Sequence, residues 1–416
     1  MDYIFDPNIW GDLPQSMMEL IIGKLPFPKV IQLRLVCKAW DRLILSMRSA
    51  PSNPIPKQLL IFTPPGGGMN YISCNLKENA LQDWVPSFLS PLVEPTGGLC
   101  LMAGGIGLLC FCTKNAGRLL VWNPISKMCR QLPQAHVRDG VNPQDVFQGC
   151  HYPYAPSNAI DIMLPIHATH RGHVMVTLIT HRHPKNFKLY VACGFENNIT
   201  LQAFDSMTSS WKMVTHLGSN DKPRLNFDCA MVFAKNFLYA VIDGELLDRT
   251  DGRRLWNIVK IHAKDDCMGD TISPPQAVVV EQQLHTIQKP QLVVHHDNLW
   301  LIVEGLLNWT FCFYELKLDG ANTRDGQSSS EWTFVKQISR DLFGGTLVVL
   351  HQCIALQELI YFRVFDIIPE GSAQLVMLVY DAFSNTWCFL NDPRGLDGRY
   401  FLYHTFVFEP SLDALI

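Results

Sequence analysis

The N-terminal part of the chain contains the stretch LPQSMMELIIGKLP at residues 13–26 and the stretch RLVCKAW at residues 34–40. In the first stretch, apolar side chains recur at positions that share one face of a helix: Met18, Ile21, Ile22 and Leu25. Pro14 suits the first turn of this helix, where a backbone amide has no partner, and Pro26 and Pro28 stop it. The sequence therefore predicts an amphipathic helix between these prolines.

A second apolar stripe follows the proline stop. Its members are spaced in alternating steps of three and four: Val30, Leu33, Cys37, Trp40 and Ile44. Leu35, Val36 and Leu43 lie off this stripe, so more than one face of the unit is apolar. A unit of about forty residues buries too little apolar surface to be stable alone, and it is a candidate docking surface. Periodicity alone is equally compatible with a helical cap packed on the following domain.

The anchors of both stretches resemble the F-box, a small helical module. In that family Leu-Pro opens the first helix, Leu-Pro closes it, and Arg-x-Val-Cys-Lys-x-Trp-x-x-Leu marks the later helices. The resemblance implies docking on an S-phase-kinase-associated (SKP) adaptor, which bridges to a cullin. The positions carried over from the family motif are Leu13, Pro14, Met17, Ile21, Leu25, Pro26, Val36, Cys37 and Trp40.

Two positions in this module depart from the family pattern. Ser16 stands where an acidic residue is common, and Met17 stands where Leu is common. Methionine preserves the apolar volume, so weaker rather than absent docking is expected. Trp40 is expected to be partly a core residue, which makes Leu13 and Pro14 the cleaner probes of an interface.

Composition bounds the class of protein. The 416 residues are 48% hydrophobic and 17% charged, which is typical of a well-buried globular protein of more than one domain. A net charge of -4 and scattered Lys and Arg residues give no reason to expect nucleic-acid binding. The thirteen cysteines lack a Cys-x-x-Cys pair, which favours reduced intracellular thiols over disulfides or a zinc ribbon.

Targeting signals are not expected. The N-terminus carries Asp2, Asp6 and Asp12 and lacks a basic region followed by an apolar one, unlike a signal peptide. The longest uncharged run, residues 95–113, contains five glycines and is interpreted as buried strands rather than a membrane span. The expected location is the nucleus, the cytoplasm or both.

The chain changes character after the helical module. Residues 46–57 contain Pro51, Pro54 and Pro56, which favour an extended connector. Beyond it, short runs rich in Val, Ile, Leu, Phe and Tyr alternate with turn residues, and residues 79–84 are the one place where a short helical turn is considered. The expected strands include residues 59–62, 174–180, 188–193, 237–242, 299–303, 347–350 and 376–380. The predicted division is an F-box at 9–50, a linker at 51–57 and an all-β domain at 58–416.

An internal repeat indicates the architecture of the all-β domain. FDSMTSSW at residues 204–211 matches YDAFSNTW at 380–387, WNPISKMC at 122–129 fits the same frame, and a broken copy spans 314–332. In this frame, an aromatic residue ends a strand, Asx, Ser or Thr residues make a turn, and a Trp, replaced by Cys129 in the third copy, begins the next strand and packs inward. Repeats of roughly fifty residues predict a β-propeller of six blades, with seven as the alternative.

The repeat resembles the kelch repeat, including a Gly-Gly pair at residues 104–105 and another at 344–345. The final apolar segment, residues 400–408, is expected to pair beside residues 59–62 and join the first and last blades. The chain as a whole resembles the plant F-box/kelch proteins, and IWGDLP at 9–14 and FVFEP at 406–410 resemble their floral-organ regulators. The predicted fold class is α+β multidomain, with a helical F-box followed by an all-β propeller.

No residue set in the sequence indicates catalysis or a cofactor. The densest ionisable cluster contains five histidines, which are interpreted as loop residues rather than metal ligands: His167, His170, His173, His181 and His183. Cys110 and Cys112 are interpreted as core thiols, and residues 295–297 as a turn. Hydrolase, phosphate-binding and dinucleotide-binding motifs are absent from the sequence. Catalytic, cofactor and metal sites are therefore not expected.

The family resemblance implies a substrate receptor of an SCF-type cullin-RING ubiquitin ligase, whose propeller holds a target protein. Residues 134–158 and 262–275 are candidate contact loops. One alternative is a propeller enzyme such as a glycoside hydrolase or an oxidase, which requires paired carboxylates or metal ligands. A second is a propeller scaffold or transcriptional co-regulator that does not promote degradation.

Overall fold

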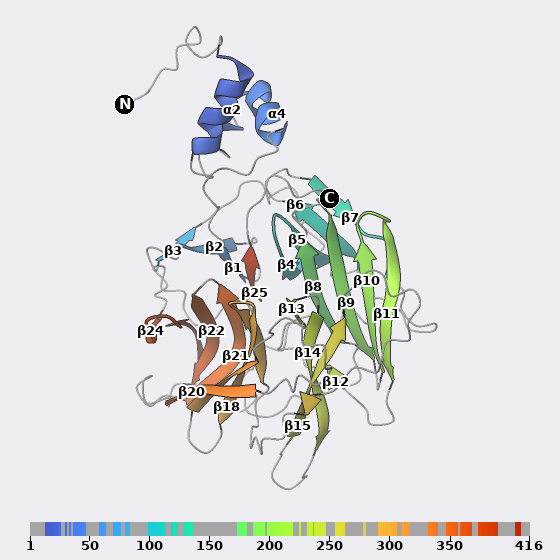
Figure 1. Cartoon of the computed structure of the whole chain (residues 1–416), viewed down its shortest axis with the longest axis vertical. Helices are drawn as coiled ribbons and strands as arrows, with labels where there is room; N and C mark the ends of the chain where they lie inside the picture. The colour runs from blue at the N-terminus through green and yellow to red at the C-terminus, as the bar shows by residue number, and fades with distance from the viewer. Residues whose placement is uncertain are drawn as a thin grey trace, which may run out of the picture.

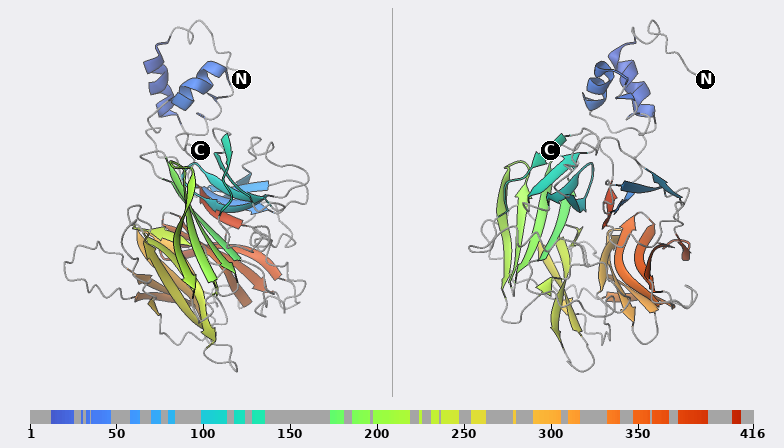
Figure 2. Two further views of the ribbon diagram at one scale, coloured as in Figure 1. Left: turned by 90° about the vertical axis from the view of Figure 1, so that its right-hand side faces the viewer. Right: turned by 180° about the vertical axis from the view of Figure 1, so that it is seen from behind.

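A computed structural model provides the structure of the chain (Figure 1). It describes residues 13–25, 30, 33–34, 36–46, 58–63, 70–75, 80–83, 99–113, 118–123, 128–135, 173–180, 186–195, 198–218, 224–225, 231–235, 237–246, 254–262, 278–279, 290–305, 310–316, 332–339, 347–356, 358–367, 373–389 and 404–408. Two helices lie at one end of the longest axis, and the β-strands form the body below them (Figures 1 and 2).

Helix α2 spans Gln15–Lys24, as the apolar spacing predicts. Pro14 precedes the helix in an extended conformation, and its carbonyl accepts hydrogen bonds from the amides of Met17 (2.9 Å) and Met18 (3.2 Å). Pro14 is thus the N-cap rather than a residue of the first turn, a position where its missing amide costs nothing. Leu25 is extended and ends the helix, while Pro26 lies outside the described residues.

Helix α4 spans Lys38–Ser46 and packs on α2. The shared core consists of Ile22, Val30, Leu43 and Ile44, with Met18, Leu25, Leu33 and Trp40 packed against it. The predicted stripe is wrong at two positions, because Cys37 is exposed and Leu43 is buried. The helix begins only at Lys38, so its inward face follows the i, i+3, i+4 spacing of Trp40, Leu43 and Ile44.

The described strands belong to six antiparallel sheets. In sheet order, the first is β25 (His404–Phe408), β1 (Gln58–Thr63), β2 (Asn70–Asn75) and β3 (Ala80–Asp83). The second is β4 (Leu99–Gly104), β5 (Leu109–Thr113), β6 (Leu119–Asn123) and β7 (Met128–Gln131). The third is β8 (His173–Thr180), β9 (Phe187–Phe195), β10 (Asn198–Asp205) and β11 (Ser210–Gly218).

The fourth sheet is β12 (Arg224–Leu225), β14 (Phe237–Leu246), β15 (Arg254–His262) and β16 (Val278–Val279), with β13 (Val232–Ala234) also paired to β14. The fifth is β17 (Gln291–His295), β18 (Asn298–Gly305), β19 (Thr310–Leu316) and β20 (Trp332–Ser339). The sixth is β21 (Leu347–Leu356), β22 (Leu359–Ile367), β23 (Ala373–Asp381) and β24 (Thr386–Phe389). Each of the expected strands named above lies within one of these elements.

At residues 79–84 the structure differs from the short helical turn considered in the sequence analysis. Residues 80–83 form strand β3 rather than a helical turn, because they pair with β2 from Ile72↔Asp83 to Asn75↔Ala80. A tertiary strand partner outweighs the weak local helix preference of such a short run. Within its described ranges, the body after residue 57 contains no helix.

The last strand pairs with the first strand of the body. Strand β25 is antiparallel to β1, with Leu59↔Val407 and Ile61↔Thr405 in register (Figure 1). Residues 404–408 therefore meet residues 58–62, as expected for the final apolar segment, while residues 400–403 lie outside the described residues. Strand β25 also contacts β4 and β21, the first strands of two other sheets.

Apolar cores lie between sheets that follow one another in sequence. Cys110 and Cys112 of the second sheet are buried with Phe187 and Phe204 of the third, which confirms both cysteines as core thiols. Phe311 and Phe313 of the fifth sheet are buried in the same way with residues of the sixth. The inner strands touch in succession, β4 with β8, β8 with β12 and β13, β13 with β17, and β17 with β21. Packing between sheets therefore supplies the core of the body.

The repeated turns have the expected construction. Phe204 pairs with Trp211, with ring centroids 5.4 Å apart, and Tyr380 pairs with Trp387 at 4.8 Å. Asp205 accepts a hydrogen bond at 2.8 Å from the amide two residues later, and Asp381 does the same. Each strand pair is thus joined by an Asx turn.

The other two copies differ from this pattern. In the third copy Trp122 pairs with Cys129, so the frame is kept without the second aromatic ring. In the broken copy Tyr314 pairs with Phe334 rather than with Trp332, which stands opposite Leu316. The hairpin in that sheet extends past the position of the usual turn, and a register shift next to Tyr314 brings Phe334 onto its ring at 5.6 Å.

Candidate functional sites: an apolar face on the helices and a histidine–glutamate cluster

The helical module leaves several large apolar side chains exposed outside its core. Met17 is 46% exposed, Leu20 58% and Val36 64%. Met17 and Leu20 are three residues apart on α2, where they share a face, while Ile22, Met18 and Leu25 face α4. We refer to Met17, Leu20 and Val36 as the apolar face. Large apolar side chains that a module leaves exposed are candidates for an interaction surface.

A hydrogen-bonded turn and an ion pair hold Val36 at this surface. The amide of Val36 donates to the carbonyl of Leu33 at 3.1 Å. Arg34 Nε lies 2.6 Å from Asp41 Oδ1, which ties the segment before α4 to the first turn of that helix. The Arg34 side chain is only 11% exposed, so this contact is shielded from solvent more than a surface ion pair is.

The nine positions expected to bind an adaptor fall into separate structural groups. Pro14, Met17, Val36 and Cys37 are exposed, and Leu13 and Ile21 are half-buried. Leu25 and Trp40 pack against the helical core, so they stabilise the module, as expected for part of the role of Trp40. Pro26 lies outside the described residues. Leu20 was not among the nine, although its spacing from Met17 was visible in the sequence.

A second cluster lies at the turn between β17 and β18. His295 pairs with Asn298, so His296 and Asp297 form a two-residue turn, as expected for residues 295–297. Both turn residues have positive φ, 48° and 60°, which is the geometry of a type I′ hairpin. His and Asp tolerate this region better than most side chains do.

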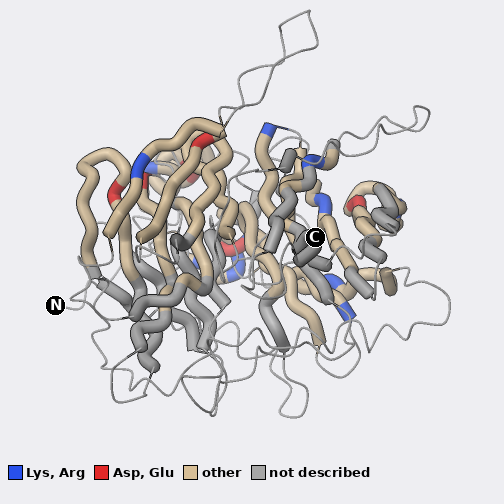
Figure 3. The backbone as a smooth tube through the Cα atoms, turned by 90° about the horizontal axis from the view of Figure 1, so that it is seen from below, with Lys and Arg blue, Asp and Glu red and all other residues tan. Residues whose placement is uncertain are grey.

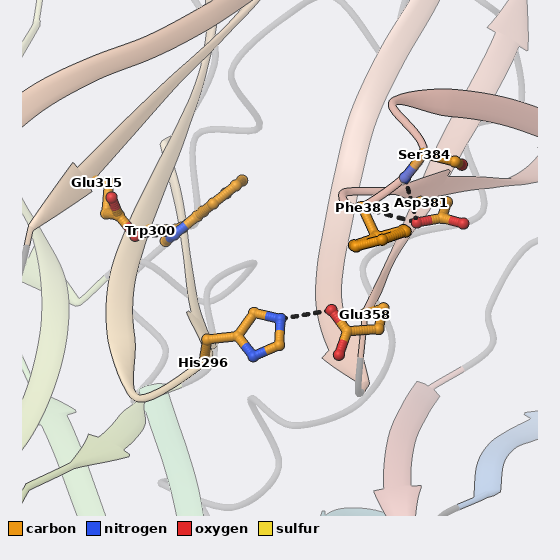
Figure 4. A network of polar contacts seen from close by, with 7 residues as sticks. All are labelled: His296, Trp300, Glu315, Glu358, Asp381, Phe383 and Ser384. Carbon is orange, nitrogen blue, oxygen red and sulfur yellow. Dashed lines mark hydrogen bonds and ion pairs between the residues drawn. The ribbon is translucent and has the colours of Figure 1, made fainter.

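His296 reaches from this turn to the neighbouring sheet (Figure 4). Its Nε2 atom lies 2.6 Å from Oε2 of Glu358, which is in the turn between β21 and β22. The carbonyl of Glu358 accepts a hydrogen bond from the amide of Ala382 at 3.0 Å, so the acidic turn is fixed to the next repeated turn. The contact thus connects equivalent hairpins of two successive sheets.

His295 lies beneath this contact and is 4% exposed. Its ring packs on Trp300 at 4.9 Å and lies edge-on to the His296 ring at 4.2 Å. Burial, followed by the neighbouring charge of His296, lowers the pKa of His295 and favours its neutral form. Its Nε2 atom is buried and has no hydrogen-bond partner among the described residues.

His295, His296 and Glu358 each offer a ligating atom, and these three atoms lie within 4.8 Å of one another. Sequence spacing does not reveal the group of His295, His296 and Glu358, because Glu358 is 62 positions from His296.

The five-histidine cluster noted in the sequence is described only at His173, in β8, and its other four members lie outside the described residues. In Figure 3 the described Lys and Arg segments are spread over the molecule, as are the Asp and Glu segments.

Comparison with known proteins identifies the N-terminal module. The sequence pattern of the F-box domain matches residues 10–50, which include α2 and α4. Residues 10–50 are an F-box domain. The resemblance of this chain to plant F-box proteins is thereby confirmed.

Several plant proteins match this chain over part of their length. An F-box/kelch-repeat protein of Arabidopsis thaliana is 30% identical over 131 residues, 30% of this chain and 32% of the relative. F-box only protein 6 of the same plant is 28% identical, over 31% of this chain and 27% of the relative. Protein ABERRANT PANICLE ORGANIZATION 1 of Oryza sativa subsp. japonica is 29% identical, over 31% of each chain. The matched region spans about a third of these relatives or less.

Solved structures resemble this F-box protein only distantly. The crystal structure of a nidogen/laminin complex contains a chain that matches with a TM-score of 0.42 and 7% identity, over 85% of this chain and 97% of that one. No helix in the described part of the F-box protein is long and apolar enough to cross a membrane.

Proposed function

We propose that this F-box protein is the substrate-receptor subunit of an SCF-type cullin-RING ubiquitin ligase. In this proposal the F-box domain binds a SKP-type adaptor, and the β body binds the protein to be ubiquitinated. The observation that carries the proposal is the F-box domain at residues 10–50, which presents Met17, Leu20 and Val36 to solvent. Apolar side chains that the domain does not bury itself are available to a partner.

The adaptor-binding surface in this proposal is the apolar face together with Pro14 and Cys37. Pro14 is an exposed N-cap, and Cys37 is exposed directly beside Val36. Leu25 and Trp40 support the surface through the helical core. Apolar residues covered by a partner form the centre of an interface, because they exclude water.

We further propose that the body is a kelch-like propeller of six blades, joined to the F-box by a connector at residues 51–57. Each of the six described sheets is one blade in this arrangement. Support comes from the succession of contacts between inner strands, which runs from β4 to β21 and returns through β25 to β4. Pairing of β25 with β1 then closes the ring without leaving a long free sheet edge.

The ligase subunit acts by position rather than by chemistry in this proposal. Holding a target beside the ubiquitin-conjugating enzyme raises the effective concentration of target lysines, and other subunits form the bond. Residues 134–158 and 262–275 are the proposed target-contact loops. The nucleus and the cytoplasm are the proposed sites of action.

Co-purification with an adaptor and a cullin tests this function. The test variant is Met17→Glu/Val36→Glu, because both residues are exposed and neither belongs to the helical core. A control is Met213→Glu, which changes a comparably exposed methionine of the body, 56% exposed on β11. We expect the wild type and the control to bind, and the test variant to lose at least about tenfold in affinity, since a charge at an apolar contact costs more than about 1.4 kcal/mol.

Circular dichroism and thermal melting establish that each protein is folded before binding is compared. A folded wild type that fails to bind the adaptor would rule out the receptor role and favour a scaffold that acts without degradation. Equal binding by the wild type and the test variant would instead show that the apolar face is not the docking surface.

A further inference from the structure

We propose that His295, His296 and Glu358 form a binding site for a zinc-class divalent cation that clips two successive sheets of the body together. The site joins the β17–β18 turn to the β21–β22 turn (Figure 4). It is independent of the proposed ligase role, because none of the three residues belongs to the F-box domain.

The three side chains have the chemistry of a transition-metal site. Two imidazoles and one carboxylate suit Zn²⁺, Co²⁺ or Cu²⁺, whereas Mg²⁺ and Ca²⁺ prefer all-oxygen sites. A set of two His and one Glu leaves the fourth tetrahedral position for water. His296 and Glu358 each have side chains that are 54% exposed, so water can reach that position.

The distances also fit a single ion after small side-chain movements. Two ligand atoms on one tetrahedral zinc ion lie roughly 3.3 Å apart, since each bond is about 2.0–2.1 Å long. The three candidate atoms lie within 4.8 Å of one another, and His296 Nε2 lies 2.6 Å from Glu358 Oε2. Binding therefore replaces the His296–Glu358 hydrogen bond with two metal bonds and moves the ring of His295 closer to the ion.

His295 is the residue that a bound ion explains best. It is 4% exposed, and its buried Nε2 atom has no hydrogen-bond partner among the described residues. A buried polar atom without a partner is uncommon in a folded protein and calls for a specific cause. The His295 ring has a hydrogen bond to the backbone of Glu358, and an ion bound between His296 and Glu358 would supply the partner that its Nε2 atom lacks.

The surroundings hold the three side chains in place. Trp300 packs against the His295 ring, and the Trp300 indole donates a hydrogen bond to Glu315 Oε1 at 3.1 Å. The side-chain amide of Asn298 donates from Nδ2 to the same oxygen at 2.9 Å. Glu358 is fixed through its carbonyl by Ala382. The carboxylate of Glu315 adds negative charge near the site, which favours a cation over an anion.

Thermal unfolding of the full chain with and without ZnCl2 tests the site. The variants are His296→Ala, which removes one ligand, and Glu358→Gln, which keeps a hydrogen-bonding group opposite His296 but removes the carboxylate. The matched control is Asp297→Asn, which changes the exposed neighbour in the same turn and suits its positive φ. We expect zinc to raise the Tm of the wild type and the control, with affinity at least about tenfold lower in both variants.

Co²⁺ spectroscopy separates this site from the thirteen cysteines of the chain. Cobalt bound to nitrogen and oxygen ligands in a tetrahedral site gives visible d–d bands without the intense near-ultraviolet bands of a cobalt–thiolate bond. The proposal expects these visible bands in the wild type and in Asp297→Asn, and their loss in His296→Ala and Glu358→Gln. Unchanged zinc stabilisation in both variants, no stabilisation of the wild type, or a spectrum dominated by thiolate bands would each overturn it.

Discussion

The ammonium group of Lys336 lies 4.6 Å from the centroid of the Tyr380 ring in the next sheet. Lys336 also donates to the Tyr380 hydroxyl at 2.9 Å and to Oδ1 of Asn385. Its equivalent three sheets earlier in the succession of contacts is Arg130, which lies 5.7 Å from the Phe204 centroid and donates to Ser209 at 2.7 Å. In both cases the last strand of one sheet provides a cation that covers the repeated turn of the following sheet.

This shared contact predicts that Lys336 stabilises the packing of the two sheets. Replacing it in Lys336→Met keeps the aliphatic stem but removes the charge over Tyr380 and the donated hydrogen bonds. We expect a loss of about 1–2 kcal/mol in the free energy of unfolding. Urea denaturation measures the loss, and Lys336→Arg should retain most of the stability. Equal losses in both variants would show that packing, not charge, accounts for the effect.

Trp211 also joins two sheets, because its indole N–H donates at 2.8 Å to the carbonyl of Pro133, which follows β7 of the preceding sheet. Trp211→Phe removes this bond and keeps a ring against Phe204, so we expect a cost of about 1 kcal/mol. Trp211→Ala also removes a buried ring and is expected to cost about 3–5 kcal/mol. Urea denaturation of both variants tests whether Trp211→Ala lowers the free energy of unfolding more than Trp211→Phe does. The control Met207→Ala, at a residue 67% exposed in the same repeat, should change stability by less than about 0.5 kcal/mol.

The features that sequence predicted are those encoded by local pattern. The spacing of Met18, Ile22 and Leu25 was enough to place α2 and its buried side. The repeat containing Phe204 and Trp211 was enough to place a turn between paired strands, since both residues of each pair lie in one short segment. Local patterns of this kind survive because the same residues that fix the turn also fix the packing.

The features that sequence did not predict depend on where elements begin and on contacts between distant segments. Cys37 and Leu43 exchanged their expected environments because α4 begins at Lys38, a boundary that periodicity does not fix. The broken repeat was assigned Trp332, whereas a register shift places Phe334 on Tyr314. The contact of His296 with Glu358 joins two turns from different sheets, and no spacing rule connects them.

The stabilising effect of Asp381 is expected to depend on pH. Hydrogen bonds from the backbone and then the hydroxyl of Ser384 hold its pKa below the ordinary value of 3.8. Because the folded-state pKa is the lower one, the unfolded chain takes up a proton first as the pH falls. The contribution of ionised Asp381 to the free energy of unfolding is thus present above pH 3.8 and is lost as the pH falls through the folded-state pKa.

The measurement is the difference in Tm between the wild type and Asp381→Asn as a function of pH. We expect the wild type to melt higher at neutral pH and the difference to narrow in acid below the ordinary pKa of 3.8. Phe383→Ala serves as a control, because the side chain is 89% exposed and the backbone amide that binds Asp381 is retained. A difference that stays constant with pH would argue against a charge-dependent role for Asp381.

Strand β25 is expected to be essential for the stability of the body. Deleting residues 399–416 removes the partner of β1 and the contacts of β25 with β4 and β21. We expect loss of cooperative thermal unfolding, monitored by circular dichroism and by intrinsic tryptophan fluorescence. Deleting only residues 411–416 leaves β25 intact and is the matched control. A deletion of 399–416 that melts like the wild type would refute the proposed ring closure.

Cysteine reactivity offers a direct test of the proposed adaptor interface. Cys37 is an exposed free thiol beside Val36, so we expect alkylation of the free F-box protein at this position. Cys193 serves as an internal control: it is buried, and burial raises its pKa to about 12, so little thiolate is present at neutral pH. Mass spectrometry after brief alkylation reads both sites in one sample.

Adaptor binding is expected to protect Cys37, because the proposed interface covers the surface that contains Val36 and Met17. Protection should disappear in Met17→Glu/Val36→Glu and remain in Met213→Glu, whereas Cys193 should stay unmodified throughout. Rapid alkylation of Cys37 within a stable complex with the adaptor would place the interface elsewhere on the F-box domain. Protection in the wild type alone would connect the exposed apolar residues of α2 and the turn before α4 to one bound partner, since a single surface must then cover both.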